Sequence, residues 1–196
     1  SEALFHLFTH GFCKALLFLG AGSVIHAMSG EQDMRKMGGI WRHIPYTYAL
    51  MWLGSLALAG IPPFAGFFSK DGILEAAYES RTMHGDVAFA LGIAAAFMTA
   101  FYSWRLLFMT FHGKPRADHH TMEHVHESPG IMLKPLLLLA LGAVLIGWIG
   151  YHAWGMIDPS LTFWKGALAL PALHAEHAAM GAEHAVPFLI HHAPLI

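Results

Sequence analysis

The sequence predicts an all-α membrane protein, a polytopic helix bundle with about four crossings of which one is a broken helix. Hydrophobic residues make up 56% of the chain and charged residues only 12%, about half the charge of a soluble domain. The apolar residues lie in long runs that can cross the roughly 30 Å of bilayer hydrocarbon. The longest run is interrupted by Pro62 and Pro63, which forbid a regular helix at that point.

Three of the expected crossings are uninterrupted. They cover about residues 3–28, 87–111 and 131–154. We expect residues 1–157 to form the transmembrane bundle. Residues 158–196 should form a C-terminal segment outside the cytoplasm, with short helices such as 172–185 but no further crossing.

The remaining apolar region, residues 44–78, is too long for one straight crossing and too short for two with a loop. Besides the two prolines, its glycines give the backbone freedom to bend, namely Gly60, Gly66 and Gly72. We therefore expect a half-helix from Ile44 to Ala59, an unwound bend around Pro62, Pro63 and Gly66, and a second half-helix from about Phe68 to Glu79.

The basic residues of the connections predict the orientation. The first and third connections hold most of them, namely Arg35, Lys36, Arg42, Lys114 and Arg116, whereas the second holds only Arg81. Lys and Arg concentrate in cytoplasmic loops. If the broken helix counts as one crossing, both basic connections lie on the cytoplasmic side.

Composition also bounds the chemistry. A formal net charge of −2 gives no basic surface for nucleic acid, and the single cysteine, Cys13, cannot form an internal disulfide. The histidine-rich connection lacks a fixed zinc spacing, so we expect no metal site. No flavin, iron–sulfur or nucleotide motif is present, and we expect no redox cofactor in this chain.

One stripe of titratable residues lies inside the first crossing. His6, His10 and Lys14 follow one another at steps of four residues, and so share one side of a helix. A lysine at the bilayer centre costs about 2.5–3.5 kcal/mol, so the stripe must face protein or water, and Thr9 and Ser23 are candidates to hold that water. The alternative is a buried lysine that is tied to a carbonyl and serves packing specificity alone.

A second intramembrane cation, Lys70, follows the double-proline break. A charged lysine near a helix N-terminus lies unfavourably in the helix dipole, which favours its neutral form or requires an anion such as Asp71 or Glu75. A lysine balanced between two protonation states suits proton transfer. In the alternative interpretation, Lys70 lies at the membrane surface, paired with Asp71, and is inert.

Three long motifs carry a family resemblance. The stretches HLFTHGFCKALLFLGAGSVIHA, EQDMRKMGGI and SLALAGIPPFAGFFSKDGIL resemble the antiporter-like membrane subunits of respiratory complex I, the family of NADH-quinone oxidoreductase subunit L and NADH dehydrogenase subunit 5. The resemblance covers roughly residues 1–155. It implies a bundle of two inverted repeats, each with a broken helix, and a hydrated axis of mid-membrane charges.

The resemblance also implies roles for single residues. Lys14 matches the family's mid-membrane lysine, His6 and His10 match the histidines before it, and Lys70 matches the lysine at the second broken helix. The family's first half and its lateral helix have no counterpart, so we expect an excerpt of the second half. Flavin, iron–sulfur clusters and quinone would belong to partner subunits, and the location would be a bacterial inner membrane rather than a mitochondrial one.

Three functions remain open at this stage. The leading one is proton translocation driven by quinone reduction elsewhere in an NADH-quinone oxidoreductase. The second is a subunit of a multi-subunit sodium/proton antiporter or of a membrane-bound hydrogenase. The third is a membrane anchor whose charges only fix helix packing.

Overall fold

The computed structural model describes residues 2–156 and 163–164, and all regular structure among them is helical. The helices are α1 (Glu2–Ala27), α2 (Pro45–Ala59), α3 (Ala65–Glu79), α4 (Met83–Phe111), α5 (His119–His124) and α6 (Gly130–Trp148). Two 3-10 turns, η1 (Met34–Lys36) and η2 (Ile40–Arg42), lie between α1 and α2, and α6 continues as a π-helical turn, η3 (Ile149–Ala153).

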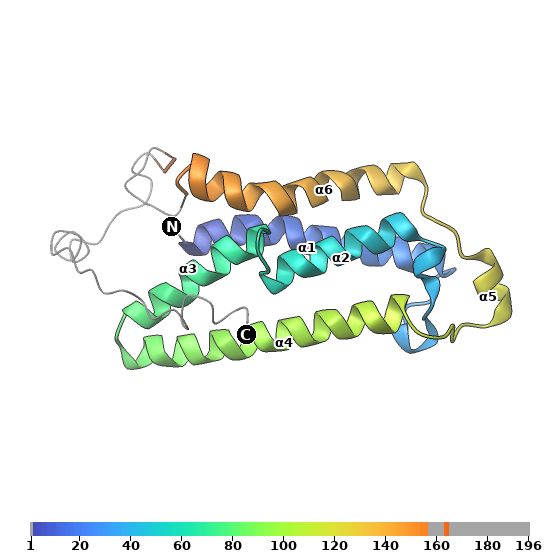
Figure 1. Ribbon diagram of the computed structural model, residues 1–196, viewed down its shortest axis with the longest axis horizontal. Coiled ribbons are helices and arrows are strands. Elements are labelled where there is room, and N and C mark those ends of the chain that lie inside the picture. The colour runs from blue at the N-terminus through green and yellow to red at the C-terminus, as the bar shows by residue number, and fades with distance from the viewer. Residues whose placement is uncertain (1, 157–162, 165–196) are drawn as a thin grey trace.

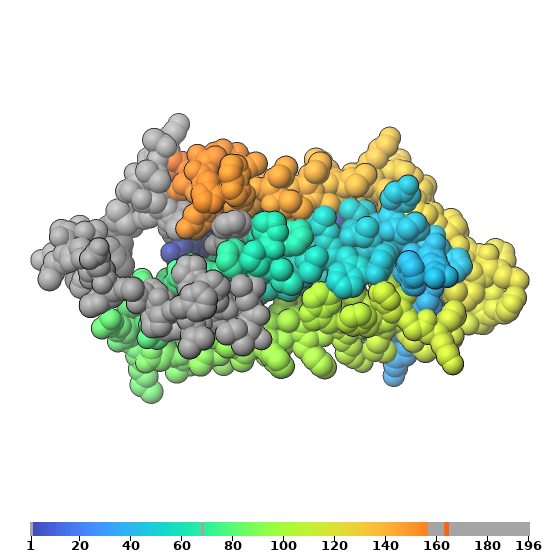
Figure 2. All heavy atoms as spheres, viewed as in Figure 1, coloured from blue at the N-terminus to red at the C-terminus, as the bar shows by residue number. Residues whose placement is uncertain are grey.

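The long helices run side by side (Figure 1). In that view α2 and α3 follow one another in a layer between α1 and α4, with α6 on the other side of α1. The space-filling view shows α6 and α4 along the two long edges of this face, with α2 and α3 between them (Figure 2). This arrangement places the broken helix against both neighbouring layers.

Three helical segments are long and apolar enough to cross a membrane, namely Glu2–Ala27, Met83–Phe111 and Gly130–Ala153. Their outward faces carry large apolar side chains, such as Phe18 and Phe97, each 70% exposed. The halves α2 and α3 have 15 residues each, about 22 Å of helix, so neither crosses the hydrocarbon alone. With the broken pair as the remaining crossing, the predicted all-α membrane bundle is confirmed.

The break is shorter than the sequence predicted, because α3 begins at Ala65 and not near Phe68. Gly60 ends α2 with φ 83°, and its N–H bonds to the carbonyls of Leu56 and Ala57. Only residues 60–64 are therefore non-helical. Pro62 and Pro63 lie in this bend, whereas Gly66, expected there, lies in the first turn of α3.

Other helix boundaries also differ from the prediction. Helix α4 begins at Met83 and not at Val87, because the side chain of Thr82 accepts a hydrogen bond from the Gly85 N–H and caps the helix. At the far end of α6, the π-helical turn brings Gly150 against the ring of Phe5, which is fully buried. The proposed short helix 172–185, and the whole C-terminal segment 158–196 apart from Phe163 and Trp164, lie outside the described residues.

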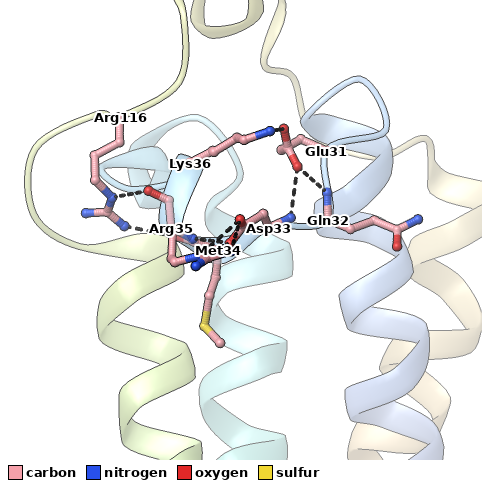
Figure 3. Close-up of polar contacts among 7 residues, drawn as sticks. All are labelled: Glu31, Gln32, Asp33, Met34, Arg35, Lys36 and Arg116. Atoms are coloured by element: carbon pink, nitrogen blue, oxygen red, sulfur yellow. Dashed lines mark hydrogen bonds and ion pairs between the residues drawn. The ribbon is translucent and has the colours of Figure 1, made fainter.

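The two basic connections meet at one end of the bundle. Arg116, after α4, donates from Nε to the Arg35 carbonyl at 2.8 Å and from Nη2 to the Met34 carbonyl at 3.1 Å (Figure 3). The turn between α3 and α4 lies at the opposite end (Figure 1). The broken helix thus acts as one crossing, as the charge pattern indicated, and the assignment of this end to the cytoplasm stays a prediction.

Asp33 stabilises the first of these connections. Its carboxylate accepts from the Arg35 guanidinium at 2.9 to 3.1 Å and from the Arg35 backbone N–H at 2.9 Å. These bonds to Arg35 lower the pKa of Asp33 to about 2. Because the pKa is lowered, the stabilising contribution of Asp33 is present at neutral pH and is lost only as the pH falls towards 2.

We therefore expect Asp33→Asn to lower the stability of the full-length subunit slightly and by the same amount from about pH 8 to about pH 5, a range in which Asp33 stays ionised. Thermal unfolding of both proteins across this range measures the difference. A difference that shrank steadily towards pH 5 would contradict the assigned pKa.

Glycine allows the two halves of the broken helix to approach closely. A Cβ at Gly66 would overlap the Ala57 carbonyl oxygen. Gly147 of α6 similarly lies against the backbone of Ala65. Main chain from α2, α3 and α6 therefore meets at the break without intervening side chains.

We expect Gly66→Ala to destabilise the full-length subunit by about 1–3 kcal/mol or more, since the added methyl group must displace backbone. Thermal unfolding in detergent measures this. The matched control is Gly11→Ala in α1, where nothing lies within 4 Å of an added Cβ and the substitution should leave stability unchanged or raise it. Equal effects of the two substitutions would refute the close approach.

Candidate functional site

A polar cluster joins α1 to α3 beside the break. His6 Nδ1 lies 3.0 Å from Ser69 Oγ, and Thr9 Oγ1 donates to the same oxygen at 2.9 Å. Thr9 and Ser69 are fully or almost fully buried, and His6 is half-buried. His6 of α1 is therefore hydrogen-bonded to the residue that directly precedes Lys70 on α3.

The two histidines form the middle of the site. The rings of His6 and His10 stack, with their centroids 5.3 Å apart. His10 is close enough to both Lys14 and Lys70 to experience the charge of each, and His6 is close enough to Lys70. The structure thus brings the four predicted residues into one electrostatic group that spans two helices.

Lys70 binds the end of the preceding half-helix. Its Nζ lies 3.4 Å from the carbonyl oxygens of both Leu58 and Ala59. Helix α2 ends at Ala59, so these carbonyls lack the usual partner within the helix, and they form the negative end of the α2 dipole. The main chain of α2 therefore provides hydrogen-bond acceptors for the Lys70 amine, which the sequence did not indicate.

The two acidic residues proposed to assist Lys70 follow it on α3. Asp71 is 7% exposed and lies close enough to Lys70 for their charges to interact, while Glu75 is half-buried. Lys70 itself is half-buried. The Lys70 side chain is thus partly enclosed by protein, and its amine donates to carbonyl groups.

Lys14 lies at the middle of α1, as predicted, but on the outer face of the described chain. Successive steps of four residues turn the stripe by about 40°, so it drifts around the helix. His6 accordingly contacts α3, whereas Lys14 is exposed. The stripe leads from the interior of the bundle to its surface.

Ser23, proposed to hold water beside the stripe, lies elsewhere. It is nine residues beyond Lys14, which places it on the opposite side of the helix. Its hydroxyl bonds to Thr47 Oγ1 at 2.7 Å and to Ser128 Oγ at 2.6 Å, near the basic connections. Of the two predicted supporting hydroxyls, only Thr9 joins the histidine cluster.

Sequence reasoning missed two groups of polar partners. Ser69 and the carbonyls of Leu58 and Ala59 complete the histidine–lysine cluster, and Glu127 with Thr47 and Ser128 surrounds Ser23. Ser69 is adjacent to Lys70 and bonds to His6 and Thr9 of α1, and its small polar side chain in an apolar segment was the available signal. Glu127 is 80 residues from Thr47, and no local pattern connects them.

The histidine-rich connection forms local contacts. His119 Nδ1 lies 3.2 Å from Glu123 Oε1, and the rings of His120 and His124 are 4.6 Å apart. Within residues 2–156 and 163–164, no three His, Cys, Asp or Glu side chains gather closely enough to hold a metal ion.

Comparison with known proteins identifies the family. Residues 1–99 match the family described as NADH:quinone oxidoreductase/Mrp antiporter, transmembrane. The chain belongs to this family. The matched segment includes α1, the broken helix α2–α3 and the first part of α4, and therefore all four predicted titratable residues of the site.

Individual relatives extend the similarity. NADH-quinone oxidoreductase subunit L of Rhodobacter capsulatus is 53% identical over an alignment of 164 residues that covers 78% of this chain and 23% of the relative. NADH-ubiquinone oxidoreductase chain 5 of Marchantia polymorpha is 44% identical over 196 residues, which are 100% of this chain and 29% of the relative. The subunit L of Rickettsia bellii is 47% identical over 195 residues, an alignment that covers 100% of this chain and 28% of the relative.

These relatives confirm the resemblance to complex I membrane subunits that the motifs indicated. The chain spans 23% to 29% of the length of these three relatives. Together with its apolar helices, the family makes it a multi-pass protein of an inner membrane, with bacterial and mitochondrial-type relatives.

The Ser69 hydroxyl should control the hydrogen bonding of His6. We expect Ser69→Ala to remove the partner of His6 Nδ1 and to change the tautomer balance of this ring, at a cost of about 1 kcal/mol in stability. Nitrogen NMR of labelled histidine in the full-length subunit reports the tautomer.

The control for this prediction is Ser103→Ala. Ser103 is also buried, but its hydroxyl donates to the Thr99 carbonyl of its own helix at 2.7 Å. The substitution Ser103→Ala should leave the His6 signal unchanged. An unchanged His6 signal in Ser69→Ala as well would show that the hydroxyl does not bond the ring.

Proposed function

We propose that this chain is a proton-conducting part of a membrane subunit of an energy-converting NADH-quinone oxidoreductase. The observation that carries the proposal is the stacking of His10 and His6, with His6 bonded to Ser69 beside Lys70 and exposed Lys14 four residues after His10 on α1. Titratable residues inside a membrane span are functional by default, because their insertion is costly.

Each member of the group has a chemical role in this proposal. Lys14 and Lys70 take up and release protons, and the imidazoles of His10 and His6 accept a proton on one nitrogen and release one from the other. Thr9 and Ser69 supply hydroxyls that can donate and accept, which holds His6 in place. Water fills the gaps that direct contacts do not close.

The break gives Lys70 its particular surroundings. The carbonyls of Leu58 and Ala59 stabilise the ammonium form, while partial enclosure in the membrane favours the neutral amine. These opposing influences suit a group that must change its charge during transport. Nearby Asp71 adds a further charge that can shift this balance.

The driving reaction would occur in other subunits. In this proposal, flavin, iron–sulfur clusters and quinone belong to partner subunits, and the present chain carries protons alone. The relatives are subunits of NADH-quinone and NADH-ubiquinone oxidoreductases by name, which supports such partners. Electron transfer and proton transfer would thus be separated in space.

The proposal predicts that Lys14→Ala and Lys70→Ala, each made in the full-length subunit within the assembled complex, lower the rate of proton transfer through this segment by about 100-fold or more. Lys14→Arg should also fail, because a guanidinium does not release its proton. Protons pumped per electron, measured in vesicles with NADH and quinone, report the effect.

The matched control is Lys134→Ala, which removes an exposed lysine near the start of α6. It should leave the pumping ratio unchanged. Full pumping in either Lys14→Ala or Lys70→Ala would refute the proposal, and full pumping in both would favour the alternative in which these charges only fix helix packing.

A second candidate is a subunit of a multi-subunit sodium/proton antiporter. The family description includes Mrp antiporters, which supports this alternative. Purification distinguishes the two: an oxidoreductase subunit should co-purify with flavin and iron–sulfur proteins, whereas an antiporter subunit should exchange sodium for protons without them.

A further inference from the structure

A second buried polar cluster lies at the end of the bundle where the basic connections meet. It consists of hydroxyls from three separate segments: Ser23 of α1, Thr47 of α2 and Ser128 just before α6. Ser23 and Thr47 are fully buried and Ser128 is 4% exposed. The Ser23 oxygen lies 2.7 Å from that of Thr47 and 2.6 Å from that of Ser128, so the cluster joins α1, α2 and the connection before α6.

Glu127 completes the cluster with a carboxylate. Its Oε2 accepts from the backbone N–H groups of Tyr46 at 2.8 Å and Thr47 at 3.3 Å. Its Oε1 accepts from the Thr47 hydroxyl at 2.5 Å and from the Ser128 N–H at 3.2 Å. A half-buried glutamate thus makes four hydrogen bonds, three of them to α2.

These bonds cap α2 from a distant part of the chain. Helix α2 begins at Pro45, and Ile44, the residue before it, supplies no side-chain cap. The N–H groups of Tyr46 and Thr47 lie in the first turn and have no acceptor within the helix. Glu127 provides both the acceptor and a negative charge at the positive end of the helix dipole.

The other end of α2 holds Lys70. The helix is 15 residues long, and its last carbonyls, from Leu58 and Ala59, accept from the Lys70 amine. Close packing makes it a stiff connector: a Cβ at Gly54 would lie 2.9 Å from a Leu17 methyl group, and Leu50 and Ala57 are buried against α1 and α6. A displacement of the first turn would therefore be transmitted to the carbonyls.

The hydroxyl cluster is poorly suited to carry protons inward by itself. Its hydrogen bonds run from Glu127 to Thr47, Ser23 and Ser128 and form a closed ring, because Ser128 is the neighbour of Glu127 in the chain. The apolar residues Cys13, Leu16, Leu50 and Leu136 form a buried cluster along the same helices. The contribution of Glu127 to the site is therefore mechanical, through α2.

We propose that Glu127 is a positioning residue for Lys70: it clamps the first turn of α2 and so holds the Leu58 and Ala59 carbonyls at the Lys70 amine. This inference rests on the proposed function, since it assigns Lys70 a role in proton transfer. It gives the connection before α6 a task in transport, although that connection is remote in sequence from the broken helix.

The test compares variants of the full-length subunit in the assembled complex. Glu127→Ala removes the clamp, and Glu127→Gln keeps one of the two acceptor oxygens but not the charge. Thr47→Val removes the hydroxyl that contacts both Glu127 and Ser23 and leaves the backbone bonds of Glu127 in place. The control is Glu123→Ala on the same connection, whose side chain is 61% exposed and pairs with His119. Protons pumped per electron and the rate of NADH oxidation are both measured, with equal amounts of assembled complex.

We expect Glu127→Ala to lower the rate of proton transfer through this segment about twofold or more, while electron transfer continues. Twofold corresponds roughly to the smallest interaction energy usual between coupled residues. Glu127→Gln should restore part of the loss, Thr47→Val should show a smaller loss, and Glu123→Ala should match the unmodified complex. A merely structural glutamate would change the amount of complex and leave the pumping ratio of what remains intact.

The two proposals fail in different ways. If Lys70→Ala lowers pumping but Glu127→Ala leaves the pumping ratio unchanged in assembled complex, the positioning role is refuted and the proposed function stands. The same holds if Glu123→Ala lowers the ratio as much as Glu127→Ala. If Lys70→Ala itself leaves pumping intact, the proposed function fails, whatever Glu127→Ala does.

Discussion

The contact between the Lys70 amine and the last carbonyls of α2 is the interaction on which the rest of the site depends. A helix that stops inside a membrane leaves carbonyl groups without partners, and hydrocarbon cannot supply any. A lysine placed one turn after the break supplies the missing donor. The unfavourable features of a broken helix and of a half-buried lysine thus offset each other.

This arrangement requires the two halves to be held closely. Gly66 lets the start of α3 approach the Ala57 carbonyl, and Gly147 lets α6 close over Ala65. At the other end of α2, Glu127 holds the first turn. The short helix α2 is therefore fixed at both of its ends by groups from elsewhere in the chain, and its apolar middle packs between α1 and α6.

Much of the fold could be predicted because it follows from long-range composition and local breaks. The apolar runs gave three crossings, the prolines gave the interrupted one, and the four-residue spacing gave the stripe on α1. The helix boundaries were less certain, since caps such as Thr82 and the positive φ of Gly60 depend on single side chains or backbone angles.

The site was predictable only in part. His6 bonds to Ser69 beside Lys70, but the drift of the stripe that exposes Lys14 depends on how α1 is rotated against α3. The carbonyl acceptors of Lys70 carry no signature in side-chain sequence. Glu127 reaches Thr47 across 80 residues, a contact that only the folded chain creates. The π-helical turn η3 (Ile149–Ala153) adds to this picture, because a π-turn contains one residue more than an α-turn and so resets the angular phase of the chain. The contact of Phe5 with Gly150 fixes the position of this turn against α1, so the residues of η3 follow a helical phase that differs from the one set by the apolar pattern of α6.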